Sequence, residues 1–249
     1  MTQTSPIALV TGASQGIGKA TALALAKTKY ELVLVARGKE KLDAVAEACG
    51  GRAHAMVCDV TDPQAVDALF DDLRRRIGRL DVVFNNAGTT LPSTEIADIA
   101  WEDWRKVLSV NLDGAFLIAR GAFGVMRDQS PRGGRIINNG SISAHMPRIG
   151  SAAYTASKAA ITGLTRTVSL DGRKHDIACG QIDIGNAASD MTDAMSKGVP
   201  QADGSLKPEP VMDVAHVADA VVHMASLPLS ANVQFMTIMA TKMPFIGRG

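Results

Sequence analysis

The sequence predicts an α/β fold with a doubly wound parallel sheet, and two observations carry this prediction. Short apolar runs alternate with helical segments along the chain, a pattern that is typical of parallel strands covered by helices on both faces. Near the start, a strand, a glycine-rich turn and a helix meet at Thr11 to Gly18, which reads T-G-A-S-Q-G-I-G. Ligands of such sheets bind beyond the carboxyl ends of the strands, so we expect the functional residues at that edge.

The first turn has the features of a phosphate-binding loop. The apolar run Ile7 to Val10 predicts a strand, and Ile17 to Lys27 has the spacing of a helix. Glycines between them permit a tight turn and a close approach to a pyrophosphate, while the helix N-terminus offers free N–H groups to anionic oxygens. Because the spacing is G-x-x-x-G-x-G and not the usual G-x-G-x-x-G, the turn alone is also compatible with a plain connection. The cofactor contacts expected here are Gly12, Ser14, Gln15, Gly16, Ile17 and Gly18.

The end of the second strand indicates which dinucleotide is bound. The strand predicted at Glu31 to Val35 is followed by Ala36 and Arg37. An NAD enzyme often places a carboxylate near this point for the ribose 2'-hydroxyl, whereas an arginine pairs with the 2'-phosphate of NADP. Ala36 supplies no carboxylate, so we expect NADP(H) with Arg37 as a contact. An arginine that merely faces water at a strand end is the alternative.

The third strand ends at a second candidate contact. A helix is predicted at Lys39 to Cys49 and a strand at Arg52 to Val57, just before Asp59 and Val60. The carboxylate of Asp59 can accept a hydrogen bond from an adenine amino group, or it can cap the helix expected to begin at Asp62-Pro63. We expect both Asp59 and Val60 at the cofactor, with the capping role left open.

The fourth strand, predicted at Leu80 to Phe84, is followed by the tetrapeptide N-N-A-G. Its small residues permit a close backbone approach, and its amides can bond neighbouring strands. Asn86, Ala87 and Gly88 are therefore expected cofactor contacts, although a simple turn is possible for the tetrapeptide alone.

The long helical stretch Trp101 to Met126 contains Asn111. An asparagine is unfavourable in the middle of a helix because its side chain competes for backbone hydrogen bonds. Asn111 therefore predicts a local irregularity or a functional contact.

The fifth strand and the next helix present a hydroxyl, a phenol and an ammonium group. The strand at Arg135 to Asn139 leads to Ser141, and the helix at Ser151 to Leu170 carries Tyr154 and Lys158. Residues four apart lie on one face of a helix, where a tyrosine and a lysine are usually only a surface pair. Here Ser141, at a strand end, can lie beside them at the cofactor.

Together, T-G-x-x-x-G-x-G, N-N-A-G and the set Ser141, Tyr154, Ser157 and Lys158 resemble the short-chain dehydrogenase/reductase family, in its short single-domain branch. The resemblance runs from Ile7 to about Leu227. It implies a Rossmann fold of about seven strands with helices on both faces, formed by one domain over residues 1–249. It also implies a homotetramer or homodimer built on the two long helices.

The resemblance further implies roles for four residues. Tyr154 is the general acid/base, Ser141 orients the substrate oxygen, Lys158 holds the nicotinamide ribose, and Asn111 supports a water-linked proton relay. Tyr154 and Lys158 thereby also contact the cofactor. A free tyrosine has a pKa of about 10, so a nearby ammonium such as Lys158 is needed to favour its phenolate.

The similarity weakens after the sixth strand. The family commonly has P-G-x-[I/V]-x-T where this chain reads I-G-N-A-A-S from Ile184 to Ser189. Gly185, Ala187 and Ser189 remain expected contacts of the cofactor, with a looser turn because the proline is missing. The segment 186–212 is the expected substrate lid. His145 and Arg148, in the loop after Ser141, are expected to face solvent, with a polar or anionic substrate end as the alternative.

The last predicted elements are a helix capped by Asp213 that runs to Ser226 and a strand at Val233 to Met239. The tail Ala240 to Gly249 departs from the D-G-G ending common in the family, and the sequence offers no physical account of it.

Composition and charge exclude several other classes of function. The net charge is +1 with acids and bases mixed along the chain, so we expect no nucleic-acid or membrane surface. The first residues lack the features of a signal peptide and no apolar run reaches membrane-spanning length, which predicts a cytoplasmic protein. Three scattered cysteines and five isolated histidines predict neither disulfides nor a metal site.

The leading interpretation is an NADP(H)-dependent carbonyl reductase or alcohol dehydrogenase that acts on a small molecule. We expect a medium-sized, largely apolar ketone or aldehyde, because methionines in the loop and lid suit varied apolar shapes. The alternative is a non-catalytic NADP(H)-binding regulator, and the altered segment 184–189 is the only sequence feature that supports it. A nucleotide-sugar epimerase of related fold would need a larger C-terminal substrate domain.

Overall fold

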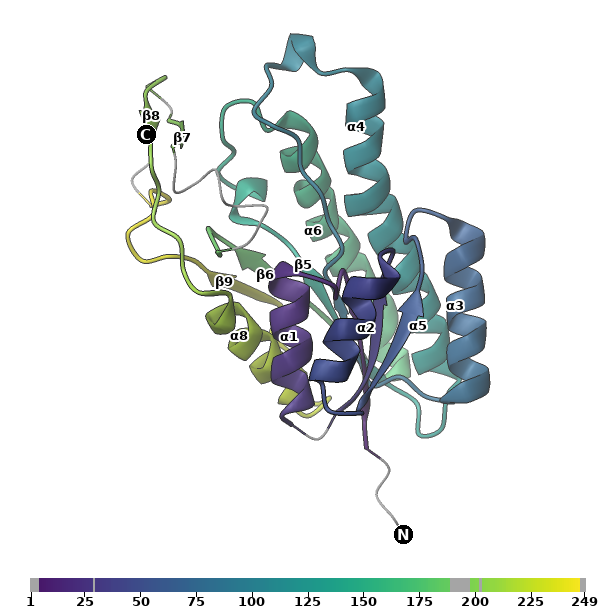
Figure 1. Cartoon of the computed structure of the whole chain (residues 1–249). Helices are drawn as coiled ribbons and strands as arrows, with labels where there is room; N and C mark the ends of the chain where they lie inside the picture. The colour runs from purple at the N-terminus through teal and green to yellow at the C-terminus, as the bar shows by residue number, and fades with distance from the viewer. Residues whose placement is uncertain (1–4, 29, 189–197, 202, 247–249) are drawn as a thin grey trace.

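The computed structural model describes residues 5–28, 30–188, 198–201 and 203–246 (Figure 1). At its centre is a seven-stranded parallel sheet with the order β3-β2-β1-β4-β5-β6-β9. Strands β2 and β3 are added on one side of β1, and the later strands, from β4 onward, are added on its other side. The strand order therefore reverses between β1 and β4. This arrangement confirms the predicted doubly wound α/β fold. The strands are β1 (Ile7–Thr11), β2 (Glu31–Ala36), β3 (Ala53–Val57), β4 (Val82–Asn85), β5 (Gly134–Asn139), β6 (Ile177–Ile184) and β9 (Phe235–Ile238).

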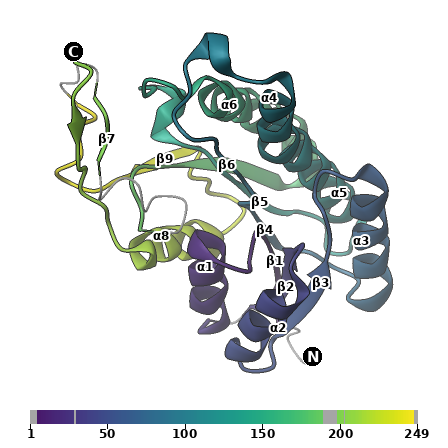
Figure 2. The same ribbon diagram turned by 45° about the horizontal axis from the view of Figure 1, so that its top comes forward.

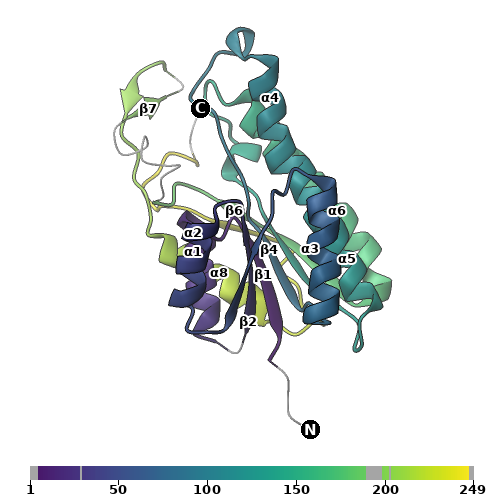
Figure 3. The same cartoon turned by 45° about the vertical axis from the view of Figure 1, so that its right-hand side comes forward.

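Helices cover both faces of the sheet, as Figures 2 and 3 show. One layer holds α1, α2 and α8, and the opposite layer holds α3, α4, α5 and α6. Each layer closes its own apolar core, because the sheet residues alternate between the two faces. The helices are α1 (Gly16–Ala26), α2 (Lys39–Ala48), α3 (Pro63–Arg76), α4 (Trp101–Leu108), α5 (Ala115–Asp128), α6 (Ala152–Gly172) and α8 (Val214–Ser226).

The central strands are buried along their whole length. All five residues of β1 and all four of β4 are buried, which explains why their sequences are continuous apolar runs and not alternating ones. The predicted strand positions agree with the structure to within two residues, and β4 and the sheet-edge strand β9 differ from the prediction at both ends. The structure starts β4 at Val82 and ends it at Asn85, whereas β9 runs from Phe235 to Ile238. Strand β9 is shorter than the predicted Val233 to Met239 because it pairs with only four residues of β6, Gln181 to Ile184.

The long helical stretch is interrupted where Asn111 predicted an irregularity. A π-helical turn, η2 (Ser109–Gly114), separates α4 from α5. The helical stretch Trp101–Asp128 contains an 18-residue window with a mean hydropathy of 1.2, which by length and composition alone is apolar enough to cross a membrane, whereas the sequence predicted no such run. It is one such stretch within the described residues, and a core helix passes the same test. In this chain α5 buries Ile118, Ala122 and Met126 against the sheet.

The three cysteines are buried and unpaired with one another. Cys49 follows α2, Cys58 follows β3, and Cys179 lies within β6. Burial raises the pKa of the Cys58 thiol to about 11, helped by the nearby Asp59 and Asp62 carboxylates. Burial alone raises the pKa of Cys179 to about 12. These thiols therefore stay protonated and act as small apolar side chains.

The remaining elements lie at the carboxyl edge of the sheet or join the helices. Asp213 caps α8 through a hydrogen bond from the Ala215 N–H, as the sequence predicted. The two short strands β7 (Val199–Pro200) and β8 (Leu206–Lys207) form an antiparallel hairpin within the expected lid. Three single-turn 3₁₀ helices complete the described elements: η1 (Ile96–Asp98), η3 (Ile142–Ala144) and η4 (Arg173–His175).

Candidate active site

The turn between β1 and α1 has the shape that an anionic group requires. Gly12 has a φ of 64°, a left-handed conformation that favours glycine, and Gly16 has a φ of 52°. A Cβ on Gly18 would lie 2.2 Å from the Gly12 carbonyl oxygen, so helix and turn could not pack this closely with any other residue. Within the described residues of α1, the first turn holds no acidic side chain and Gln15 makes no capping bond. Its first N–H groups are available to a phosphate, and the turn fits a dinucleotide.

The N-N-A-G segment is fastened to this turn. The Thr11 hydroxyl accepts hydrogen bonds from the N–H groups of Asn86 and Ala87 at 2.8 and 2.9 Å, and the Asn86 amide donates to the Thr11 carbonyl at 2.9 Å. Asn139 in turn donates to the Asn86 side-chain oxygen at 2.8 Å. The amides therefore bond neighbouring strands as the sequence predicted, and they hold the ends of β1, β4 and β5 in register.

Arg37 and Asp59 lie at the ends of β2 and β3. Their closest side-chain atoms are 4.0 Å apart, and the Arg37 side chain is 75% exposed, so the guanidinium is open to a further anionic partner. Asp59 accepts hydrogen bonds from the N–H and hydroxyl of Thr61, and the backbone bond is the main cause that lowers the pKa of this carboxyl. The helix cap is Asp62, whose carboxylate accepts from two N–H groups of α3. The capping role left open for Asp59 is therefore filled by Asp62.

Asn111 is held in the π-helical turn by three hydrogen bonds. Its side-chain oxygen accepts from the Thr89 N–H at 2.7 Å, and its amide donates to the Thr89 carbonyl at 2.9 Å and to the Ser157 hydroxyl at 3.0 Å. Ser157 donates to the carbonyl of Tyr154 at 2.7 Å. Asn111 thus joins the loop after β4 to the helix that carries Tyr154 and Lys158.

Desolvation shifts the pKa values of the Tyr154 phenol and the Lys158 ammonium in opposite directions. Burial raises the pKa of Tyr154, while a hydrogen bond with Ser141 and the positive charge of Arg148 work against the rise. Burial lowers the pKa of Lys158 to about 8, while the Asp183 carboxylate works against the fall. The Lys158 ammonium donates to the Asn139 carbonyl at 2.7 Å. Ser141, Tyr154, Lys158 and Asn111 therefore belong to one connected cluster at the carboxyl edge of the sheet.

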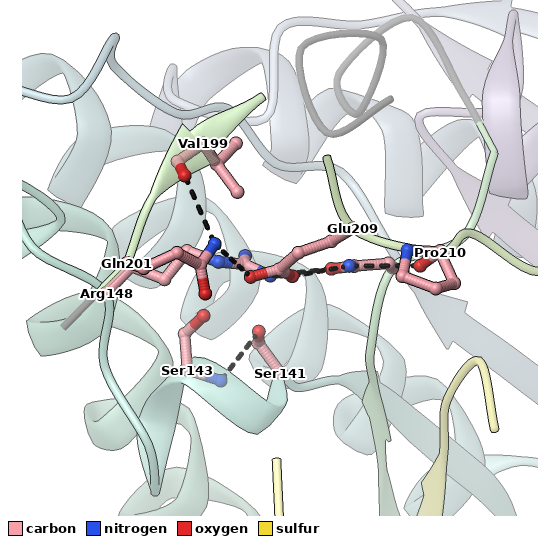
Figure 4. Close-up of polar contacts among 8 residues, drawn as sticks. Ser141, Ser143, Arg148, Val199, Gln201, Glu209 and Pro210 are labelled. Atoms are coloured by element: carbon pink, nitrogen blue, oxygen red, sulfur yellow. Dashed lines mark hydrogen bonds and ion pairs between the residues drawn. The ribbon is translucent and has the colours of Figure 1, made fainter. Parts of the chain in front are cut away.

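Arg148 does not face solvent, contrary to the sequence expectation. Its side chain is 15% exposed and pairs with Glu209, which is 2% exposed, and it also donates to the side-chain oxygen of Asn186 at 2.8 Å. Asn186 and Gln201 donate to the Glu209 carboxylate at 2.7 and 3.1 Å. Figure 4 shows the side chains of Arg148, Gln201 and Glu209 side by side, and the Ser141 hydroxyl points toward them.

Glu209 is a site residue that the sequence reading missed. No local motif marks it, because its partner Arg148 lies 61 positions earlier in the chain. The available signal was a carboxylate between two prolines, P-E-P, at the end of the expected lid. Burial raises the pKa of Glu209, but hydrogen bonds from Asn186, Arg148 and Gln201 outweigh burial and place the pKa below its usual value.

The turn after β6 is tied down, although the missing proline predicted a looser one. The Asn186 carbonyl accepts from the Met212 N–H at 2.8 Å, and the Met212 carbonyl accepts from the Ala188 N–H at 2.8 Å. Asn186 and Ala187 are both buried. Ser189, together with the lid methionines Met191 and Met195, lies outside the described residues.

The C-terminal tail packs under the site. Ala240 and Met243 are buried with Ile142, the residue that follows Ser141. No sequence pattern explained this tail, and the structure shows that it packs against the turn η3. Among the described residues, no group of three or more His, Cys, Asp and Glu side chains could hold a metal ion.

The chain is similar in sequence to known oxidoreductases. A family model described as "short chain dehydrogenase" matches residues 6–200. The chain is 39% identical over 197 residues to a 3-oxoacyl-[acyl-carrier-protein] reductase of Synechocystis sp., covering 78% of each chain. It is 36% identical over 196 residues to a 3beta-hydroxysteroid dehydrogenase of Mediterraneibacter gnavus, covering 78% of this chain and 70% of the relative.

Among solved structures, the fold is similar to that of 3-ketoacyl-(acyl-carrier-protein) reductase from Brucella melitensis complexed with NADH. The TM-score is 0.85 at 22% sequence identity, and the match covers 95% of this chain and 98% of the other. This likeness supports the fold that the strand order already shows.

Proposed function

Because the chain belongs to the short-chain dehydrogenase/reductase family, we propose that it is an NADP(H)-dependent oxidoreductase that interconverts a carbonyl and an alcohol. The observation that carries this proposal is the cluster of Ser141, Tyr154 and Lys158 at the carboxyl edge of the sheet. Ser141 and Lys158 are buried, and Asn111 joins the cluster to the loop after β4. The cluster offers a proton donor, a hydrogen-bond donor and a cation at one point.

The proposed cofactor site extends along the edge from β3 to β6. The turn of α1 would hold the pyrophosphate, Arg37 the 2'-phosphate, and Asp59 with Val60 the adenine. When bound, the nicotinamide supplies or accepts the hydride. The preference for NADP(H) over NAD(H) rests on Arg37 alone. The similar structure from Brucella is complexed with NADH, so the shared fold does not distinguish the two cofactors. Residues near the nicotinamide end would be Asn86, Ala87, Gly88, Tyr154, Lys158, Gly185, Ala187 and Ser189.

Tyr154 would donate the proton in the reductive direction. Its raised pKa keeps the phenol protonated at neutral pH, and the Ser141 hydroxyl would donate a second hydrogen bond to the same substrate oxygen. The Ser141 oxygen already accepts from the Ser143 N–H at 3.1 Å, which leaves the hydroxyl proton to be donated. Lys158 would hold the nicotinamide ribose and favour the phenolate that forms when the proton leaves.

Asn111 would support the return of a proton to Tyr154 through a water-linked relay. Its side chain is fixed by the loop after β4 and by Ser157, so its position relative to α6 does not depend on the lid. Asn111 lies in the π-helical turn η2, where the backbone departs from regular α-helical hydrogen bonding, and such turns are frequent at functional sites.

The proposed substrate is a medium-sized, largely apolar carbonyl compound. The relatives' names refer to a hydroxysteroid and to a 3-oxoacyl thioester, which are consistent with this class. The buried pairing of Arg148 with Glu209 also leaves less free positive charge at the site than a strongly anionic substrate would use. We further propose one cytoplasmic domain, with a lid at 186–212, that assembles as a homotetramer or homodimer.

A screen of NADPH and NADH consumption over ketones, aldehydes, quinones and acyl thioesters tests the proposal. We expect turnover with NADPH and at least one apolar carbonyl, and better kcat/KM for cyclic or aromatic ketones than for polyol-type substrates. Tight binding of NADPH without turnover of any carbonyl would favour the non-catalytic regulator. No binding of either dinucleotide would refute both functions.

A further inference from the structure

The strand β6 ends with a buried carboxylate directly beside Ser141. Asp183 is 2% exposed and its first carboxylate oxygen accepts from the Ser141 N–H at 3.0 Å and from the Gln181 side-chain amide at 2.7 Å. Its second oxygen lies 3.2 Å from His145 Nε2. One side chain therefore bonds the backbone of Ser141 and the loop that follows it.

Gly140, which has no side chain, leaves room for the Asp183 carboxylate. A Cβ on Gly140 would lie 2.1 Å from Asp183 Oδ1 and 2.6 Å from the Gln181 amide nitrogen. Because the obstructing atoms belong to a buried network and not to a free side-chain end, they could not move away cheaply. Gly140 and Asp183 are thus a matched pair, and the carboxylate occupies the space that a side chain at 140 would need.

The surroundings of Asp183 show which charges it can act upon. His145 faces it from the loop after η3 and Lys158 acts on it from α6, while its own strand contributes the neutral Gln181. The residue paired with it on β9 is the uncharged Thr237. Burying a carboxylate is costly unless it is hydrogen-bonded and paired. The buried cation near it is Lys158, because the Lys158 ammonium donates to the carbonyl of Asn139 at 2.7 Å while Asp183 accepts from the N–H of Ser141, two residues further on.

We propose that Asp183 is a positioning residue that fixes the backbone of Ser141 and sustains the positive charge of Lys158, with Gly140 providing its space. This inference rests on the proposed function of Ser141 and Lys158. Asp183 touches no reacting atom; it acts through the serine that orients the substrate oxygen and through the ammonium that favours the phenolate.

The first test replaces the charge but keeps the shape, in Asp183→Asn. In the free protein, the titration of the Lys158 ammonium is followed by 15N NMR and assigned with Lys158→Arg. Loss of an opposite charge should move the Lys158 midpoint below its value of about 8, by about one pKa unit. This readout needs neither substrate nor cofactor, so it can succeed or fail independently of the proposed reaction.

With a carbonyl substrate from the screen, Asp183→Asn should lower kcat on the order of ten-fold with little change in KM, because the bound ground state is less affected than the oriented transition state. The alkaline decline of the reductive rate should begin at lower pH. Asp176→Asn is the matched control, since Asp176 lies just before the first residue of β6 and its carboxylate pairs with the exposed Arg132. It should change neither kcat nor the Lys158 titration.

Gly140→Ala reaches the same carboxylate from the opposite side. It should lower kcat because Ser141 is displaced, yet move the Lys158 midpoint less than Asp183→Asn does, because the charge is retained. Melting temperatures identify which variants fold, and either folded variant decides the matter. A Lys158 midpoint and kcat that both match wild type in folded Asp183→Asn, or an unchanged kcat in folded Gly140→Ala, would overturn the inference.

Discussion

The Lys158 ammonium lies 5.7 Å from the centre of the Tyr154 ring, one turn further along α6. The protein shields both groups from much of the solvent, which disfavours the charged form of each and therefore moves their pKa values in opposite directions. At neutral pH the phenol keeps its proton while most of the ammonium remains charged. This state suits the reduction of a carbonyl, in which Tyr154 gives up a proton.

Tyr154→Phe should abolish turnover while the protein still folds and binds NADPH. The ring is retained, and only the hydroxyl that would transfer the proton is lost, so kcat should fall by at least about 100-fold. Steady-state kinetics with a wild-type substrate, together with NADPH titration, provide the measurement. Tyr30→Phe is a suitable control, because Tyr30 bonds the Ala225 carbonyl far from the cluster. A kcat near that of wild type would exclude Tyr154 as the proton donor.

The reductive kcat/KM should decline as the pH rises through about 8, the pKa of Lys158. Above this pH the ammonium loses its proton and no longer stabilises the phenolate that forms in the reaction. In Lys158→Arg the decline should move to higher pH, since a guanidinium stays charged, although the altered geometry should reduce the rate. A pH profile that is flat from 7 to 9 in wild type would contradict the role given to this charge.

Arg37→Ala should weaken NADP(H) and leave NAD(H) nearly unaffected. A well-formed bond between arginine and phosphate contributes about 1.5 to 3 kcal/mol, so the Kd for NADPH should rise by about ten-fold or more. Calorimetric titration of both cofactors measures the difference. Arg127→Ala, which removes an exposed arginine paired with its neighbour Asp128, is the control. Equal affinity of the wild type for the two cofactors would disprove the assignment.

Glu209→Gln should destabilise the protein by about 3 kcal/mol, because it leaves Arg148 without the carboxylate of a buried pair. Since the folded pKa of Glu209 lies below its usual value, the pair stabilises the fold above pH of about 4.3, and this contribution disappears as the pH falls through the folded pKa. The difference in unfolding free energy between wild type and variant, measured with urea, should therefore be smaller at pH 3 than at pH 7.

Asp203→Asn is the matched control for this variant. Asp203 pairs with Lys207 in the same hairpin, but both side chains are 63% exposed, so the substitution should hardly change the melting temperature. Equal destabilisation by the two substitutions would show that burial of the Arg148 pair contributes nothing.

Gly163→Trp should disrupt the assembly that we propose for α6. In the part of the chain that the structure describes, a Cβ at Gly163 would meet no atom within 4 Å beyond its chain neighbours and the adjoining backbone of α6, so we expect the monomer to tolerate a larger side chain. If helices of two subunits approach closely at this point, the ring would separate them. Sedimentation velocity should show a dimer or tetramer for wild type and a smaller species for the variant, and a monomeric wild type would contradict the proposal.

The sequence predicted the fold because its signals were local. Apolar runs, glycine turns and caps such as Asp62 depend on neighbouring residues, and the described elements follow them closely. The Asn111 irregularity was also predictable, since an asparagine in mid-helix is costly in itself.

The contacts that the sequence reading missed join distant segments. Glu209 and Arg148 are 61 residues apart, and Asp183 reaches Ser141 across 42 residues. A buried carboxylate is unfavourable at either position until its partners are present, so no local pattern marks it. For the same reason Arg148 resembled an ordinary surface arginine.

The three buried cysteines can report local unfolding of the chain. In the folded state their thiols are protonated and shielded, so alkylating and oxidising reagents react with them slowly. The three positions sample three places in the fold, after α2, after β3 and within β6. The rate at which each thiol is labelled therefore measures how often its own segment separates from the rest, and the order of labelling follows the order in which the sheet comes apart.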